Sequence, residues 1–165
     1  INNLSQISKK TDSSVERFAA FCHALDDQEI ASLCNRLGTP NEFSDLATLT
    51  KKYSTAILSA ANHHQDNAGL STSNGTIDKI DKILKATSAI RKPDRFKQLV
   101  KLVIWLQAKS EKGPIYSFWL ALLERYQEVD PQKWIAQGYA GAALGSKIHQ
   151  DRIERIQAYI ESSLS

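Results

Sequence analysis

Methionine is absent from the 165 residues, and the chain begins at Ile1. Because translation starts at methionine, we expect this chain to be a piece of a longer polypeptide. Long apolar runs are also missing. None approaches the ~18 residues of a membrane span, and the opening INNLSQISKK lacks the apolar core of a secretory signal. With 42% hydrophobic residues, the chain can fill a core, and we expect a soluble cytoplasmic protein without a membrane segment.

Cysteine is scarce, with only Cys22 and Cys34. Two cysteines that lie within apolar helical patterns form neither a disulfide framework nor a CxxC metal clip, so we expect buried, reduced thiols and a reducing compartment. The sequence has no glycine-rich phosphate loop, no GxSxG and no HExxH. The candidate chemistry is therefore confined to histidines, basic residues and one glycine-rich turn.

No segment shows the alternation of apolar and polar residues that is typical of a β-strand. Apolar residues instead recur every three or four positions along most of the chain. The pattern predicts an all-α fold of several helices. The polar stretch 62–75 contains two glycines and predicts a loop. It would divide the chain into two helical subdomains, residues 1–75 and 76–165. The expected helices cover residues 14–25, 27–37, 40–57, 77–90, 93–106, 115–126, 131–137 and 142–162.

Local signals mark several helix ends. Asp27 is a candidate N-cap of the second helix, and Gly38 would end it. Thr39, Pro40 and Glu42 have the spacing of a capping box for the third helix.

The histidines do not predict a metal site. His23 lies in RFAAFCHALDD and is followed by Ala24, and His63 and His64 lie in the predicted polar loop. A hydrolytic divalent metal needs several converging histidine and aspartate ligands. We therefore expect no metal site and no catalytic residue in this chain.

Positive charge is concentrated in the second half of the sequence. Residues 1–76 hold six Lys/Arg and eight Asp/Glu, whereas residues 77–165 hold fifteen and ten. Lys79, Lys82 and Lys85 recur opposite an isoleucine stripe, and further basic residues follow up to residue 101. Such a stripe can follow RNA phosphates, although a solvated helix face gives the same pattern.

The turn QGYAGAALGSK, residues 137–147, is the third candidate. Glycines at the start of a helix expose backbone N–H groups to an anion. The alternative, which spacing alone favours, is that Gly138 caps a helix and Gly145 permits close helix packing.

Two longer segments carry a family resemblance. AIRKPDRFKQLV (89–100) and VDPQKWIAQGYAGAALGSKIHQDRIERI (129–156) resemble the C-terminal body and tail of bacterial CCA tRNA nucleotidyltransferases, the multifunctional CCA proteins. The first carries the family's Arg-(Lys/Arg)-Pro-x-Arg helix start, and the second its Gly-(Phe/Tyr)-x-Gly-x-x-(Ile/Leu)-Gly turn. ERFAAFCHALD and LCNRLGTPNEFSDLATL (33–49) are similar to the family's His-Asp segment. The resemblance covers about residues 15–160.

The resemblance implies a division of labour. In family members with a working phosphohydrolase domain, an aspartate would follow His23 and a further His-Asp would fall near Ser54 and Thr55, whereas this sequence has Ala24, Ser54 and Thr55 there. The stretch between Asp27 and Gln28 also looks shortened relative to the family, so the HD site is expected to be degenerate. In the family, CCA addition with Mg²⁺, CTP and ATP occurs in an N-terminal head that this chain lacks. The body and tail hold the acceptor and TΨC arms of tRNA.

We therefore expect a non-catalytic segment that positions tRNA for 3′-CCA addition. The expected RNA contacts are Lys79, Lys82, Lys85, Arg91, Lys92, Arg95, Gly141, Gly145, Lys147 and Arg152. Two alternatives remain open: an HD-type metal phosphohydrolase with a rearranged site, and a helical protein–protein interaction or dimerisation module. Homo-oligomerisation is also left open.

Overall fold

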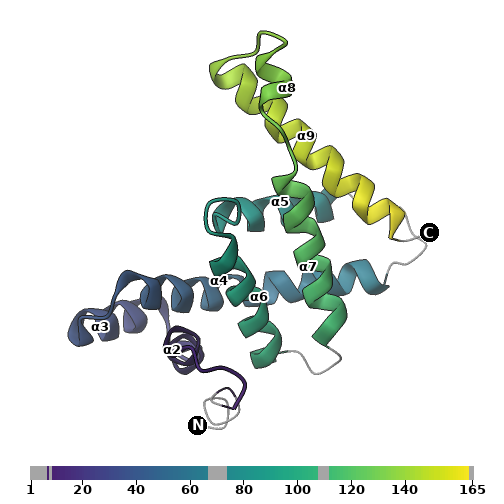
Figure 1. Ribbon diagram of the computed structural model, residues 1–165. Helices are drawn as coiled ribbons and strands as arrows, with labels where there is room; N and C mark the ends of the chain where they lie inside the picture. The colour runs from purple at the N-terminus through teal and green to yellow at the C-terminus, as the bar shows by residue number, and fades with distance from the viewer. Residues whose placement is uncertain (1–6, 8, 67–73, 108–111, 164–165) are drawn as a thin grey trace.

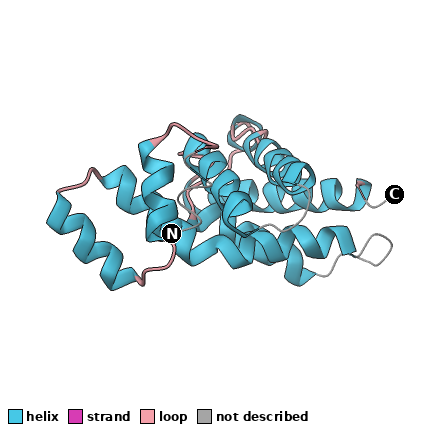
Figure 2. Cartoon of the chain, turned by 90° about the horizontal axis from the view of Figure 1, so that it is seen from below, coloured by secondary structure: helices cyan, strands magenta, loops and turns pink. Residues whose placement is uncertain are grey.

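The computed structural model describes residue 7 and residues 9–66, 74–107 and 112–163. These residues form helices joined by turns, and none of them lies in a strand (Figure 2). The all-α prediction is confirmed. From residue 14 onwards, the described helices are α2 (Ser14–Cys22), α3 (Asp27–Leu37), α4 (Asn41–Asp66), α5 (Asn74–Ala86), α6 (Pro93–Gln107), α7 (Lys112–Gln127), the single turn α8 (Gln132–Ile135) and α9 (Gly141–Ser162).

Helix α4 is the longest and is central to the packing (Figure 1). Helices α2, α3, α5, α6 and α7 all contact it, α9 packs on α5 and α7, and α8 packs on α9. In the view of Figure 1, α8 and the start of α9 project away from the other helices. No helix in the described residues is long and apolar enough to cross a membrane.

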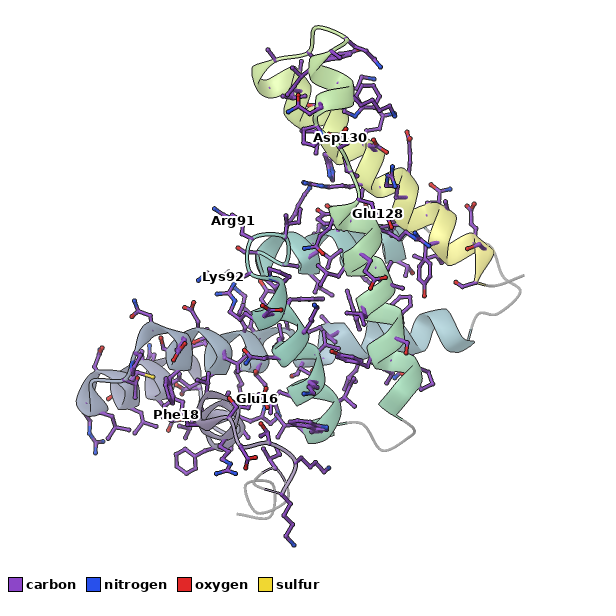
Figure 3. The ribbon with its side chains drawn as sticks, viewed as in Figure 1. Glu16, Phe18, Arg91, Lys92, Glu128 and Asp130 are labelled. Carbon is purple, nitrogen blue, oxygen red and sulfur yellow. The ribbon has the colours of Figure 1, made fainter. Side chains whose placement is uncertain are left out.

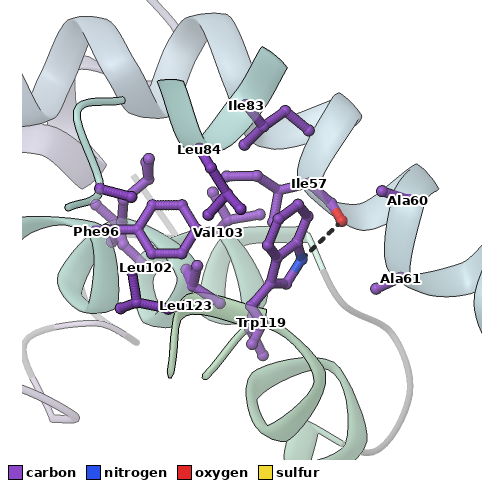
Figure 4. Close-up of a cluster of buried hydrophobic side chains, with 14 of the residues drawn as sticks. Ile57, Ala60, Ala61, Ile83, Leu84, Phe96, Leu102, Val103, Trp119 and Leu123 are labelled. Atoms are coloured by element: carbon purple, nitrogen blue, oxygen red, sulfur yellow. Dashed lines mark hydrogen bonds between the residues drawn. The ribbon is translucent and has the colours of Figure 1, made fainter. Parts of the chain in front are cut away.

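The core is built from both halves of the sequence. Trp119 is 1% exposed, and its indole N–H donates to the carbonyl of Ile57 at 3.1 Å (Figure 4). The Phe96 ring meets the Trp119 ring edge to face, with ring centroids 5.7 Å apart. One continuous cluster of buried side chains therefore joins α4 to α6 and α7. The division at residue 75 stays a prediction.

Several helix ends differ from the prediction. Helix α5 ends at Ala86 and not at residue 90, and α7 begins at Lys112 and not at residue 115. Helix α2 ends at Cys22, before the expected residue 25. Helix α4 continues to Asp66 and α5 begins at Asn74, so part of the predicted loop 62–75 is helical. The stretch NHHQD contains no glycine or proline, and polarity alone does not end a helix. Residues 67–73 of the predicted loop lie outside the described part of the chain.

The predicted capping box at Thr39 and Glu42 is not formed. Helix α3 ends with Gly38 in the left-handed region, at φ 61°, and the N–H of Thr39 donates to the carbonyl of Cys34 at 3.1 Å. That N–H is thus already used to close α3, and the Thr39 hydroxyl has no hydrogen-bond partner. The reciprocal capping box is instead at Asp26 and Glu29, so the N-cap is Asp26 and not Asp27.

Candidate nucleic-acid interface

An open cleft of about 280 Å³ lies between the end of α5, the turn that follows it, the end of α7 and the middle of α9. Its polar lining consists of Lys85, Ser88, Arg91, Tyr126 and Arg152, and Leu84 and Ile90 complete it. Three residues expected to contact RNA, which are distant in the sequence, are therefore brought together.

The turn after α5 is fixed by backbone hydrogen bonds. The N–H of Ala89 donates to the carbonyl of Leu84, and the N–H of Ser88 donates to that of Lys85, both at 2.9 Å. This is the Schellman pattern that ends many helices, and it places Ser88 at φ 53°, where glycine is usual. The reversal of the chain there brings Arg91 to the edge of the cleft.

Arg95 and Lys92 connect this turn to α4. Arg95 donates through Nη1 to Asp45 Oδ2 at 2.8 Å and through Nη2 to the carbonyl of Thr87 at 2.6 Å. Lys92 Nζ lies 3.5 Å from the same carboxylate. Only 18% of the Arg95 side chain is exposed, so an RNA contact at Arg95 would compete with this link. Figure 3 shows Arg91 and Lys92 projecting outward from the turn.

A buried carboxylate at the base of the cleft compensates one of its cations. The Tyr126 hydroxyl donates a hydrogen bond to Asp81 Oδ1 at 2.8 Å, and Asp81 Oδ2 lies 2.9 Å from Lys85 Nζ. His149 Nε2 lies 3.2 Å from Lys85 Nζ, and its Nδ1 lies 3.6 Å from Asp81. Burial, and then the hydrogen bond to Asp81, raise the pKa of Tyr126 well above its ordinary value. The phenol therefore remains a donor at neutral pH.

The two arginines of the cleft have no such partner. Within the described residues, neither Arg91 nor Arg152 makes an ion pair. The guanidinium of the half-buried Arg152 lies over the Tyr126 ring, 4.9 Å from its centroid, and its Nε is buried without a hydrogen-bond partner. Partly buried donors that carry charge are costly when unpaired. An anion such as a phosphate would satisfy them.

The acidic residues near the cleft, Asp151 on α9 and Glu128 after α7, form ion pairs with arginines outside the cleft. Asp151 is paired with Arg155 at 3.2 Å, and Arg155 also lies 3.2 Å from Glu128. Glu128 in turn accepts from Arg125 at 3.0 Å. These charges compensate one another between α7 and α9, so they do not neutralise the two arginines of the cleft.

Four of the five remaining predicted contacts lie on exposed surfaces, and the fifth, Lys147, is half-buried near the start of α9. Lys79 and Lys82 are exposed on α5 opposite the buried Ile77 and Ile80, which confirms the two-faced helix. Gly141 and Gly145 are exposed in the first turns of α9, and the N-cap Ala140 supplies no side-chain hydrogen bond.

Gly145 does not permit a close helix contact. A methyl group added there would meet nothing within 4 Å, so the packing explanation for this glycine was wrong. Whether Lys79, Lys82, Gly141 or Gly145 contacts RNA stays a prediction.

The histidines show no metal geometry in the part of the chain that the structure describes. No three His, Cys, Asp or Glu side chains there converge as ligands. Burial, and then the nearby Lys51 charge, lower the pKa of His23. The side chains of His63 and His64 lie outside the described residues.

Sequence reasoning missed Ser88, Asp81 and His149 as parts of the site. Asp81 and Lys85 have the i, i+4 spacing of a helical ion pair, which was visible in the sequence. Ser88 carried no signal, because the left-handed position that it occupies is normally marked by glycine.

Comparison with known proteins finds relatives with similar sequences. The chain is 31% identical over 134 residues to the multifunctional CCA protein of Teredinibacter turnerae, covering 78% of this chain and 29% of that protein. For the multifunctional CCA protein of Hahella chejuensis the identity is 30% over 136 residues, covering 79% and 29%. No family model and no solved structure matches the chain.

A third alignment bears on the predicted shortening. The multifunctional CCA protein of Psychromonas ingrahamii is 27% identical over 181 positions, which cover 94% of this chain and 41% of that protein. Because 181 positions exceed the 165 residues here, this relative has residues that the chain lacks. The resemblance expected from the sequence is confirmed, and the chain spans about three-tenths of the length of the first two relatives.

Proposed function

Because the chain is similar along about four-fifths of its length to a segment of the multifunctional CCA proteins, we propose that it is a tRNA-positioning segment. It would hold the acceptor and TΨC arms of tRNA through their phosphates. The observation that supports this most is that Arg91 and Arg152 line the same cleft and that neither has an acidic partner among the described residues. Double-stranded RNA is recognised by shape and backbone contacts, which such a cleft suits.

In this proposal the segment is not catalytic by itself. Addition of nucleotides with Mg²⁺, CTP and ATP is assigned to another part of a longer protein, and the HD site is assigned as degenerate. Ala24 in place of an aspartate beside His23 supports the second assignment.

Charge reversal in the cleft tests the proposal. We expect the double variant Arg91→Glu/Arg152→Glu to bind tRNA at least about tenfold more weakly than the unmodified chain at low salt, measured by fluorescence anisotropy. For each RNA phosphate that the variant no longer neutralises, the slope of log affinity against log salt should fall by roughly 0.9, taking the duplex DNA value as a guide. The double variant should therefore depend less on salt.

Arg36 provides the matched control. It is exposed on α3, at the other end of the molecule from the cleft, and has no ion pair among the described residues. Arg36→Glu, introduced together with Lys52→Glu on α4, changes the net charge by the same amount. If the control pair weakens tRNA binding as much as the cleft pair, the cleft is not the binding site. If the unmodified chain does not bind tRNA at low salt, the proposal fails.

One observation favours a second candidate, the interaction or dimerisation module. An open groove of about 520 Å³ between α2 and α3 is lined by Phe21, Leu25 and Leu33, and Phe21 and Leu37 are 55% and 60% exposed. Exposed apolar surface of this kind marks protein contacts. Sedimentation velocity over a range of chain concentrations decides between a monomer and a dimer.

A further inference from the structure

The projecting end of the molecule carries a cluster of aromatic and basic side chains. It comprises α8, the turn after it and the first turns of α9, residues 132–147, which we name the tip (Figure 1). Most residues of the tip are exposed, and the apolar Ile135 is 45% exposed. Helix α8 packs on α9, so the tip stands apart from the main core.

Two aromatic rings define the surface of the tip. Trp134 and Tyr139 are both half-buried, their ring centroids are 5.9 Å apart, and the planes meet at 84°. Backbone hydrogen bonds fix the turn between them. The N–H of Gly138 donates to the carbonyl of Ile135 at 2.9 Å, and the N–H of Tyr139 donates to that of Trp134 at 3.1 Å. The rings are therefore held in place by a short, closed turn.

Lysines border both rings. Lys147 Nζ lies 5.5 Å from the Trp134 centroid and 5.6 Å from the Tyr139 centroid, and Lys133 Nζ lies 4.5 Å from the Trp134 centroid. Lys133 also lies 3.8 Å from Asp151. Lys147 makes no ion pair among the residues that the structure describes. The tip thus combines fixed ring surface with one uncompensated cation.

Proteins that bind single-stranded nucleic acid combine aromatic and basic side chains in this way. Unpaired bases stack on aromatic side chains while basic side chains contact the adjoining phosphates. Cation–π contacts at a protein surface are generally weaker than base–aromatic stacking, so a base can compete with the ammonium of the half-buried Lys147 for the rings. The displaced ammonium then remains within reach of the phosphate of the same nucleotide.

We propose that the tip binds an unpaired nucleotide of an RNA loop, with the base stacked on Trp134 or Tyr139 and Lys147 on its phosphate. This inference rests on the proposed function and adds to it. The cleft at Arg91 and Arg152 would contact duplex phosphates, and the tip would contact a loop. A duplex without unpaired bases would therefore occupy the cleft and leave the tip empty.

The test compares two RNA probes with the same stem. One is a hairpin with a loop of unpaired nucleotides, and the other is the blunt duplex without the loop. We expect Trp134→Ala/Tyr139→Ala to weaken hairpin binding about tenfold or more and to leave blunt-duplex binding within about twofold. Ile135→Ala is the matched control, because it removes exposed apolar surface from the same tip without removing a ring. It should change neither affinity.

A second variant, measured in two ways, distinguishes the loss of stacking from misfolding of the tip. Trp134→Phe keeps a ring and should retain most of the hairpin affinity, while abolishing the tryptophan fluorescence change that hairpin binding causes in the unmodified chain. Equal losses on hairpin and duplex, or no loss on either, would overturn the stacking proposal while leaving tRNA binding intact. Failure of the unmodified chain to bind either probe would instead remove the proposed function on which the inference rests.

Discussion

Cys22 has no exposed surface, and burial raises the pKa of its thiol to about 11. The nearby Cys34 adds to this shift. An unfolded chain loses the thiol proton above about pH 8.5, whereas the folded chain keeps it. The stabilising contribution is therefore complete below that pH and is lost as the pH rises towards 11.

The prediction is an alkaline loss of stability that depends on Cys22. Between about pH 8.5 and 10, Cys22 should contribute a fall of up to roughly 1.4 kcal/mol per pH unit to the free energy of unfolding. Urea denaturation of the unmodified chain and of Cys22→Ala at both pH values measures it. The variant starts less stable but should have the shallower slope. Identical slopes would show that the thiol titrates alike in both states.

The capping boxes show how far single residues can be predicted. Residues 26–29 and 39–42 both place a capping residue three positions before glutamate, and only the first forms a capping box. The difference is the N–H of Thr39, which already bonds to Cys34 at the end of α3. A cap signal that directly follows another helix end thus competes for the same backbone group, and sequence spacing does not reveal the competition.

At the scale of an element, the turn after α5 stores strain at Ser88. A serine at φ 53° costs about 1 kcal/mol relative to glycine. We expect Ser88→Gly to raise the free energy of unfolding by roughly that amount, measured by urea denaturation. Ser88→Ala keeps the Cβ in the same conformation and should gain nothing. A destabilised Ser88→Gly variant would show that the serine hydroxyl, which lines the cleft, stabilises the turn.

The helices themselves were more predictable than their ends. Isoleucines 77, 80 and 83 are buried on one face of α5, and α9 starts within one residue of the expected position. Apolar periodicity reports which face packs. The end of α4 was missed because the stretch after Ala61 is polar but contains no helix breaker before Asp66.

At the scale of the whole molecule, the basic residues could be identified from the sequence, but their positions relative to one another could not. Lys85, Arg91 and Arg152 meet because α9 returns to pack on α5. The same packing separates them from Lys147, which lies at the tip. The structure was also needed to find the partner of each charge. Asp45 pairs with Arg95 and Asp81 with Lys85, whereas Arg91 and Arg152 have no acidic partner in the described part of the chain.

The continuous core makes a prediction about cooperativity. The hydrogen bond from Trp119 to Ile57 and the ion pair of Arg95 with Asp45 both cross the predicted boundary at residue 75. A break in either half should therefore destabilise the other. We expect urea unfolding followed by far-ultraviolet circular dichroism and by tryptophan fluorescence to give coincident single transitions, as two-state unfolding requires.

Arg95→Ala tests the coupling directly. It removes both the link to Asp45 and the bond to the carbonyl of Thr87, and such losses cost ~1–3 kcal/mol each when the remaining partner is buried. Because 41% of the Asp45 side chain is exposed, we expect the lost ion pair to cost little. The total should then be close to the cost of the bond to the buried Thr87 alone. Both probes should shift together. All three tryptophans lie in residues 76–165. If helix content is lost in two steps while tryptophan fluorescence follows only one, residues 1–75 and 76–165 unfold as separate units, and the boundary predicted from the polar stretch is real.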